Sequence, residues 1–239
     1  MVASTDRRAA WRASFAVALA VSAYGVSFGA LAVASGLDIL QTCVLSLVMF
    51  SGGSQFALIG VLATGGTAAG PAAIAGATLL GLRNGLYAIR VSPIVGPGWA
   101  KRLLAGHLTI DESTAVATAQ PTLETQRIGF WATGAMIYVG WNLTTLLGAI
   151  LGDQLGDVRQ WGLDAAAAAA FLGLVWPRLT ALQPVAVAVG AAVVASALIP
   201  VLPQGVPVLA AALVAVVVGL TNFLGDRTSP TLQQPGALS

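Results

Sequence analysis

The chain has 239 residues, of which 57% are hydrophobic and only 8% charged, with a net charge of +2. Soluble domains carry about 25% charged residues, so this composition and a mean hydropathy of +0.86 indicate a polytopic membrane protein. A single cysteine excludes an intrachain disulfide, and one histidine without a cysteine cluster gives no metal-site spacing. No Walker-type loop is present, so the chain has no visible ATPase of its own. We expect no cofactor and no metal.

The N-terminus predicts a retained membrane helix that starts in the cytoplasm. Three arginines precede the apolar run 13–34, and basic residues favour the cytoplasmic side. The alternative is a cleaved twin-arginine signal peptide, because Ala32-Val33-Ala34 resembles a cleavage site. The run also carries a face of small residues at helical spacing, which favours close packing against a neighbouring helix. That face comprises Ala18, Ser22, Gly25 and Gly29.

The next apolar run, residues 39–63, is broken near its middle. Asp38 is placed to cap a half-length helix over residues 39–50, and residues 55–63 form a second one. Backbone groups released between them must find partners inside protein or at a water-filled cavity. Broken helices of this kind often form the substrate site of secondary transporters. The candidate substrate-binding residues here are Ser51, Gly52, Gly53, Ser54 and Gln55.

A third apolar segment, residues 72–94, contains two arginines. Arg83, Tyr87 and Arg90 share one helix face, and Asn84 lies beside them. An arginine at mid-bilayer costs about 2.5–3.5 kcal/mol on insertion scales, so it usually faces a cavity or a partner. Arg90 can reach the membrane interface, whereas Arg83 cannot do so easily. We therefore take Arg83, Asn84 and Tyr87 as candidate substrate-binding residues.

Residues 96–127 form the polar belt of the chain, with an amphipathic stretch expected at the membrane interface. It holds the only adjacent acidic pair, Asp111 and Glu112. These two residues either start a solvated helix, where acids suit the helix dipole, or act as ion-coupling carboxylates or partners of Arg83. We expect His107 to be a surface histidine.

The second half of the chain begins with a clear spanning helix over residues 128–151. Asn142 lies in its middle and is equally suited to helix–helix hydrogen bonding and to substrate contact. An acidic loop follows at 152–162, and then come apolar runs at 163–174, 185–199 and 208–220. Residues 226–239 are polar and rich in proline, as expected of a disordered cytoplasmic tail.

Charge bias gives the topology. Basic residues cluster before the first helix and in the polar belt, so both regions are predicted to be cytoplasmic, while the acidic loop is predicted to be outside. This requires an odd number of crossings between residues 38 and 97. One full span and one re-entrant segment at 51–54 satisfy it, and three shorter crossings are the alternative.

The predicted fold is an all-α, polytopic transmembrane helix bundle of six or seven spans, with a broken or re-entrant helix near 51–55. We expect a single domain, residues 1–225, in the cytoplasmic (inner) membrane with both termini inside. Gly36-Leu37-Asp38 and Gly162-Leu163-Asp164 follow corresponding helices. This echo leaves open two inverted structural repeats, residues 13–97 and 128–223.

Four stretches, in this order along the chain, give a family resemblance. They are Phe50-Ser51-Gly52-Gly53-Ser54-Gln55-Phe56-Ala57, Leu82-Arg83-Asn84 with Leu86-Tyr87, Leu108-Thr109-Ile110-Asp111-Glu112-Ser113, and Gly162-Leu163-Asp164 through Phe171-Leu172. With them the chain resembles the AzlC family of branched-chain amino-acid permeases, the large component of AzlC/AzlD-type exporters. The resemblance implies export of branched-chain amino acids or analogues. It also implies a small hydrophobic membrane partner of the AzlD type.

The function predicted from the sequence is secondary transport, with an ion gradient as the driving force because no ATPase motif is present. The alternative is a membrane scaffold or assembly subunit that transports nothing itself. A channel is a further alternative. An intramembrane enzyme is disfavoured, because no Ser-His, Asp-Asp or His-Glu-x-x-His arrangement occurs. Nothing predicts binding to nucleic acid.

Overall fold

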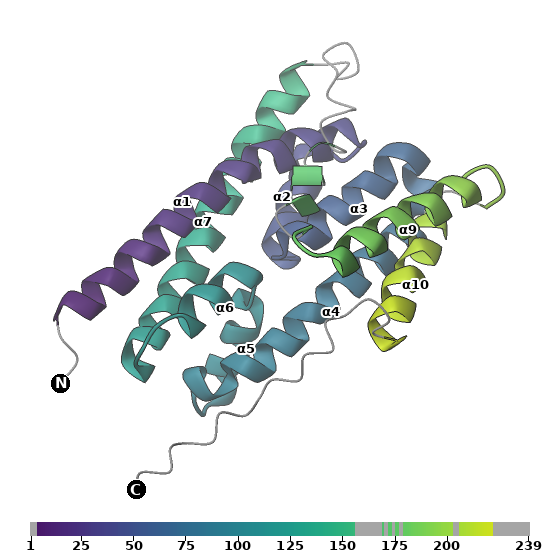
Figure 1. The fold of residues 1–239 in the computed structure, drawn as a ribbon. Coiled ribbons are helices and arrows are strands. Elements are labelled where there is room, and N and C mark those ends of the chain that lie inside the picture. The colour runs from purple at the N-terminus through teal and green to yellow at the C-terminus, as the bar shows by residue number, and fades with distance from the viewer. Residues whose placement is uncertain are drawn as a thin grey trace, which may run out of the picture.

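The computed structural model describes residues 4–155, 169, 172–173, 175–176, 179–202 and 206–221. Its elements are α1 (Ser4–Ala34), α2 (Ile39–Val48), α3 (Gly52–Gly65), the 3-10 helix η1 (Gly66–Ala69), α4 (Gly70–Val95), α5 (Trp99–Leu108), α6 (Asp111–Thr118), α7 (Leu123–Leu155), α9 (Leu182–Leu198) and α10 (Val206–Thr221). No strand occurs in these ranges, so the predicted all-α class is confirmed (Figure 1). The predicted tail at 226–239 and the echo at 162–164 lie outside the described residues.

Three stretches of the described chain are long and apolar enough to cross a membrane. They are α1, α7 and the continuous stretch Gly52–Val95 that contains α3 and α4. The apolar helices α2, α9 and α10 are shorter. The structure is therefore a helical membrane bundle, as predicted, and the number of six or seven spans stays a prediction.

Helices α1 and α7 lie side by side along most of their length (Figure 1). Glycines bring the two backbones together: a Cβ at Gly29 would overlap the carbonyl of Thr145, and one at Gly148 would overlap that of Val26. The hydroxyl of Thr144 donates to the carbonyl oxygen of Ser22 at 2.6 Å. Small residues allow such backbone approach in lipid, where van der Waals packing drives helix association. The predicted small-residue face of the first helix is thus confirmed as a packing face.

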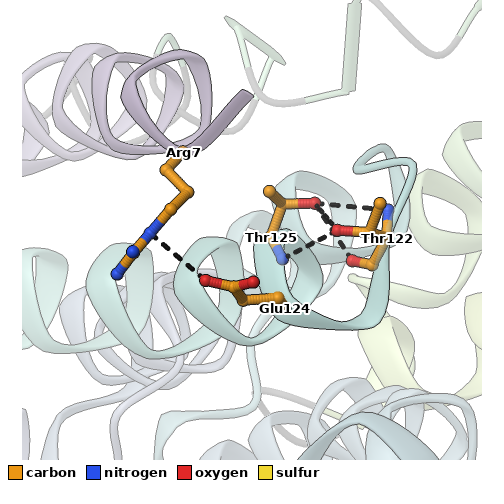
Figure 2. Close-up of polar contacts among 4 residues, drawn as sticks. All are labelled: Arg7, Thr122, Glu124 and Thr125. Atoms are coloured by element: carbon orange, nitrogen blue, oxygen red, sulfur yellow. Dashed lines mark hydrogen bonds and ion pairs between the residues drawn. The ribbon is translucent and has the colours of Figure 1, made fainter. Parts of the chain in front are cut away.

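An ion pair joins the first turns of these two helices. Arg7 Nε lies 3.2 Å from Glu124 Oε1, and both side chains are exposed (Figure 2). Beside it, Thr122 Oγ1 accepts from the amide of Thr125 and Thr125 Oγ1 accepts from that of Thr122, which caps α7 (Figure 2). Because both the starts and the ends of α1 and α7 meet, the helices run parallel.

The parallel orientation bears on the expected internal repeats, since α1 and α7 open the two halves. Repeats related by an axis along the membrane normal give parallel counterparts, whereas inverted repeats give antiparallel ones. This pair of helices therefore has the orientation of parallel repeats. The repeat boundaries at 13–97 and 128–223 stay a prediction.

The end of α4 returns to the end of the bundle where α1 and α7 begin. Arg127 Nε, on the second turn of α7, donates to the carbonyl oxygen of Ile94 at 2.9 Å. Arg102 Nε donates to that of Gly96 at 3.2 Å. These arginines satisfy carbonyl groups at the C-terminus of α4, where positive charge is also favoured by the helix dipole. Arg7 in α1 and Arg102 and Arg127 of the polar belt thus lie at one end of the bundle, and the side of the membrane that this end faces stays a prediction.

Candidate functional site

The break between α2 and α3 consists of Met49, Phe50 and Ser51. The amide of Met49 still donates to Leu45 O at 2.9 Å, and the amide of Ser51 turns back to Met49 O at 2.8 Å. The first hydrogen bond of the new helix runs from the Gln55 amide to Ser51 O. The predicted broken helix is confirmed, but the break lies at 49–51 rather than at 51–54, because Gly52, Gly53 and Ser54 form the first turn of α3.

The side chain of Gln55 reaches back across this break. Its Nε2 donates to Met49 O at 2.7 Å and to Ser46 O at 3.4 Å, and its Oε1 accepts a 2.8 Å bond from Trp141 Nε1. Gln55 is fully buried and Trp141 is 4% exposed. Carbonyl groups at the end of α2 therefore find a partner inside the protein, as a helix break within a membrane requires.

The two glycines at the start of α3 allow neighbouring helices to approach it. A Cβ at Gly52 would lie 3.3 Å from the Trp141 ring. A Cβ at Gly53 would lie 2.8 Å from Arg83 Nη2, closer than real Cβ contacts. The guanidinium of Arg83 consequently lies directly against the first turn of α3.

Arg83 forms an ion pair with Asp111, the first residue of α6. Arg83 Nη1 lies 3.2 Å from Asp111 Oδ2, and the two side chains are 27% and 21% exposed. Glu112 follows on the same first turn and is half-buried. The pairing of Arg83 with an acid of the polar belt, one of the alternatives from the sequence, is what the structure shows.

A cavity of about 560 Å³ opens beside the break. Its walls come from residues 49–58 at the break and α3, from residues 74–85 of α4, and from residues 106–109 at the end of α5. The apolar part includes Met49, Phe50, Leu58, Ile74, Ala77 and Leu82. The polar part comprises Ser51, Ser54, Thr78, Asn84, His107 and Thr109.

Three of the predicted site residues line this cavity: Ser51, Ser54 and Asn84. The Ser51 hydroxyl donates to Ser54 Oγ at 3.2 Å. Asn84 Oδ1 is buried and has no hydrogen-bond partner among the described residues. A buried acceptor without a partner loses about 1–3 kcal/mol of solvation, so Asn84 is suited to receive a ligand donor.

The other predicted site residues lie outside the cavity lining. Gly52 and Gly53 contact Trp141 and Arg83, Gln55 supports the break, and Tyr87 lies half-buried on α4. Arg83 and Asp111 form their ion pair, and Glu112 stays beside it on α6. Asn142 Nδ2 donates to Tyr138 O of its own helix at 2.7 Å. Of the predicted set, three residues thus line the cavity, and Gln55 and Arg83 contact the break from outside the lining.

His107 is a cavity residue that the sequence analysis missed. It was expected at the surface, but it is half-buried and lines the cavity. Its ring centroid lies 5.2 Å from that of Tyr138 and 6.0 Å from that of Phe50, and these two rings meet edge to face at 5.0 Å. The available signal was its place two residues before Thr109, next to a stretch that carries the family resemblance.

Trp141 is the second missed residue. Tryptophans of membrane helices are enriched at the two interfaces, whereas this one lies in the middle of α7. It packs in a nearly parallel stack against Phe28 at 6.0 Å and edge to face against Phe56 at 6.3 Å. A mid-helix tryptophan next to Asn142 was the signal that could have identified it.

Comparison with known proteins gives one match. The family model described as AzlC protein matches residues 16–155, which is more than half of the 239-residue chain and covers α1 from residue 16 and all of α2 to α7. No curated protein and no solved structure matches the chain. The match thus includes the break, the cavity and the Arg83–Asp111 pair.

Proposed function

Because this chain belongs to the AzlC family, which is associated with membrane transport rather than with an enzyme class, we propose that it is a secondary transporter that exports branched-chain amino acids or related small amino acids. The observation that carries this proposal is the cavity beside the helix break, which has an apolar wall and a polar wall. A zwitterionic amino acid with an aliphatic side chain needs both.

The apolar wall suits a branched aliphatic side chain. Leu58 of α3 and Ile74, Ala77 and Leu82 of α4 contribute to it. Binding sites for small molecules are typically apolar cavities of about 300–1,000 Å³ with a few polar groups that fix the orientation of the ligand. The cavity of about 560 Å³ falls in this range and leaves room for water beside a small amino acid.

The polar wall offers partners for the two charged groups of the substrate. Asn84 Oδ1, a buried acceptor without a described partner, suits the ammonium group. The Ser51 side chain does not cap the start of α3, so the first backbone amides of this helix remain as donors for a carboxylate near Ser51 and Ser54. Amides at a helix break serve substrate carboxylates in other transporter folds.

The driving force is an ion gradient in this proposal, with Asp111 and Glu112 as the candidate coupling carboxylates. Asp111 is held by Arg83 beside the break, so a change in its charge would act directly on the first turn of α3. We further propose that the protein works in the cytoplasmic membrane, with both termini inside and with a small hydrophobic membrane subunit of the AzlD type.

The competing proposal is a scaffold subunit without transport of its own. It is favoured by the internal use of the polar residues Gln55, Arg83 and Asn142, because Gln55 and Arg83 bond to other elements and Asn142 bonds within α7. The two proposals differ in the cavity, because only a transporter requires Asn84 to bind a solute.

The experiment is flux of radiolabelled leucine, isoleucine, valine and methionine in vesicles, with and without the small subunit and with an imposed proton gradient. We expect wild-type flux to be lost in Asn84→Ala and retained in Thr118→Ala, whose hydroxyl bonds within its own helix. Absence of flux for all four amino acids under every condition contradicts the transporter and favours the scaffold. Flux that ignores the proton gradient removes the proton-coupled version.

A further inference from the structure

The cavity contains one titratable side chain. Among the described residues that line it, only His107 can carry a charge, since the others are apolar, hydroxyl-bearing, amide or glycine. The chain has a single histidine, so this is also the only imidazole in the protein. An imidazole always has at least one N–H donor, and it gains a positive charge when both nitrogens are protonated.

The position of this imidazole is fixed by ring packing. The Tyr138 ring of α7 meets the imidazole edge to face at 73°. The Phe50 ring of the helix break is the second ring beside it, with 6.0 Å between the ring centroids. These are ring contacts, and no hydrogen bond joins an imidazole nitrogen to another described residue. His107 therefore has a defined place in the wall while its polar atoms stay open to a ligand.

Two other polar groups of the same wall have their protons engaged. The Ser51 hydroxyl donates to Ser54 Oγ, and the Thr109 hydroxyl donates to Ala105 O at 2.6 Å. Arg83, the cation that the sequence favours for a carboxylate, does not line the cavity and is paired with Asp111. The imidazole is consequently the one group of the described lining that can bring a positive charge to an anionic end of a solute, beside the donors that the first amides of α3 offer.

We propose that His107 is a substrate-recognition residue whose imidazole N–H donates to the carboxylate of a small zwitterionic solute in the cavity between the helix break, α4 and α5. Asn84 Oδ1 receives the ammonium group of the same solute, so the two side chains read its opposite charges. This inference rests on the proposed function, because it assigns the contacts of the transported amino acid.

The single histidine permits a direct test that does not depend on transport. Diethyl pyrocarbonate carbethoxylates imidazole with an absorbance increase near 240 nm, so in this chain the signal reports His107 alone, provided that the purification tag lacks histidine. We expect L-leucine to slow the labelling of the purified protein. Leucinol, which keeps the aliphatic chain and the amine but lacks the carboxylate, should protect much less. Equal labelling rates with and without saturating leucine overturn the inference.

Variants separate recognition from a merely structural role. His107→Ala should weaken leucine binding by about 10- to 100-fold, as expected for a lost hydrogen bond to a charged group, and His107→Gln should recover part of it. Leucinol binding should change little in both variants. Lys101→Gln, on the exposed part of the same helix, is the matched control and should bind leucine as the wild type does. Equal losses for leucine and leucinol in His107→Ala show a structural role and overturn the proposal.

Parallel flux measurements distinguish this inference from the proposed function. Leucine flux without protection of His107 leaves the transporter proposal in place and overturns the role of His107. Protection without flux supports recognition by His107 and contradicts the transporter. If neither is observed, both proposals fall.

Discussion

Trp141 Nε1 donates a hydrogen bond to Gln55 Oε1 at 2.8 Å, across 86 positions of sequence. The amide nitrogen of the same glutamine donates to the carbonyl of Met49, so α7 is connected through one side chain to the end of α2. The indole ring also lies over Gly52, where a Cβ would come within 3.3 Å of it. Trp141 thus fixes the break from two directions, by a hydrogen bond and by packing.

Trp141→Phe tests this connection, because it keeps most of the ring and removes the N–H. Gln55 Oε1 is then buried without a donor, and we expect a loss of about 1–3 kcal/mol in the free energy of unfolding. Thermal unfolding in detergent measures the effect. Trp11→Phe is the control, since Trp11 is 49% exposed, and its unfolding temperature should match that of the wild type. Equal unfolding temperatures for both variants would contradict a supporting role for Trp141.

The existence of the break could be predicted from local sequence, because a pair of glycines interrupts an apolar run. Its position could not, since the glycines are helical in α3 and the non-helical residues are 49–51. The side chain that bonds the carbonyl groups at the break could not be predicted. Gln55 was taken for a substrate ligand, since nothing near it in sequence says that its amide is used by Met49 and Trp141. Contacts between residues so far apart in the chain depend on how α7 packs, which periodicity does not specify.

The same limit explains the outcome for Arg83 and His107. Charged groups in lipid need partners, so scarcity of acids made pairing between Arg83 and the belt predictable. Whether a residue faces a cavity depends instead on where its helix is placed. His107 lies on the short helix α5, and the face that this helix turns toward the break follows from its packing on α4 and α7. A lone histidine at a helix end carries no local sign of that environment.

The glycine contacts between α1 and α7 give a second prediction. Gly148→Ala introduces a Cβ that overlaps the backbone of Val26, which cannot move as a flexible side chain can. We expect the variant to be destabilised by at least the 1–3 kcal/mol typical of overpacking. Gly219→Ala on α10 meets no atom within 4 Å among the described residues, so it should be neutral or slightly stabilising. The measurement is unfolding of both variants in the same detergent, and a fully stable Gly148→Ala would contradict the close approach.

The Arg83–Asp111 pair gives a third prediction through a double-mutant cycle. Arg83→Ala and Asp111→Ala each leave one half-buried charge without this partner, whereas the double variant removes both. We expect a coupling energy of about 0.5–3 kcal/mol in unfolding measurements, in the range found for residues in contact. Leucine export should be abolished in Arg83→Ala while the protein still inserts in the membrane. Additive effects of the two substitutions would show that the pair does not contribute as a pair, and normal export by a well-expressed Arg83→Ala would remove its functional assignment.

The parallel packing of α1 and α7 predicts where their ends lie relative to the membrane. Arg7 and Glu124 meet at one end, while Gly152 packs against Ala30 toward the other. The chain has one cysteine, so Cys43→Ser gives a background without thiols, into which Thr5→Cys, Leu123→Cys and Gln154→Cys are introduced one at a time. All three positions are exposed in the structure. In intact cells whose outer envelope lets the reagent pass, a membrane-impermeant maleimide should label residue 154. Residues 5 and 123 should be labelled only after the cytoplasmic membrane is permeabilised. Labelling of residues 5 and 123 from opposite sides would be incompatible with the parallel pair, and labelling of both from outside would invert the proposed orientation while leaving the packing intact.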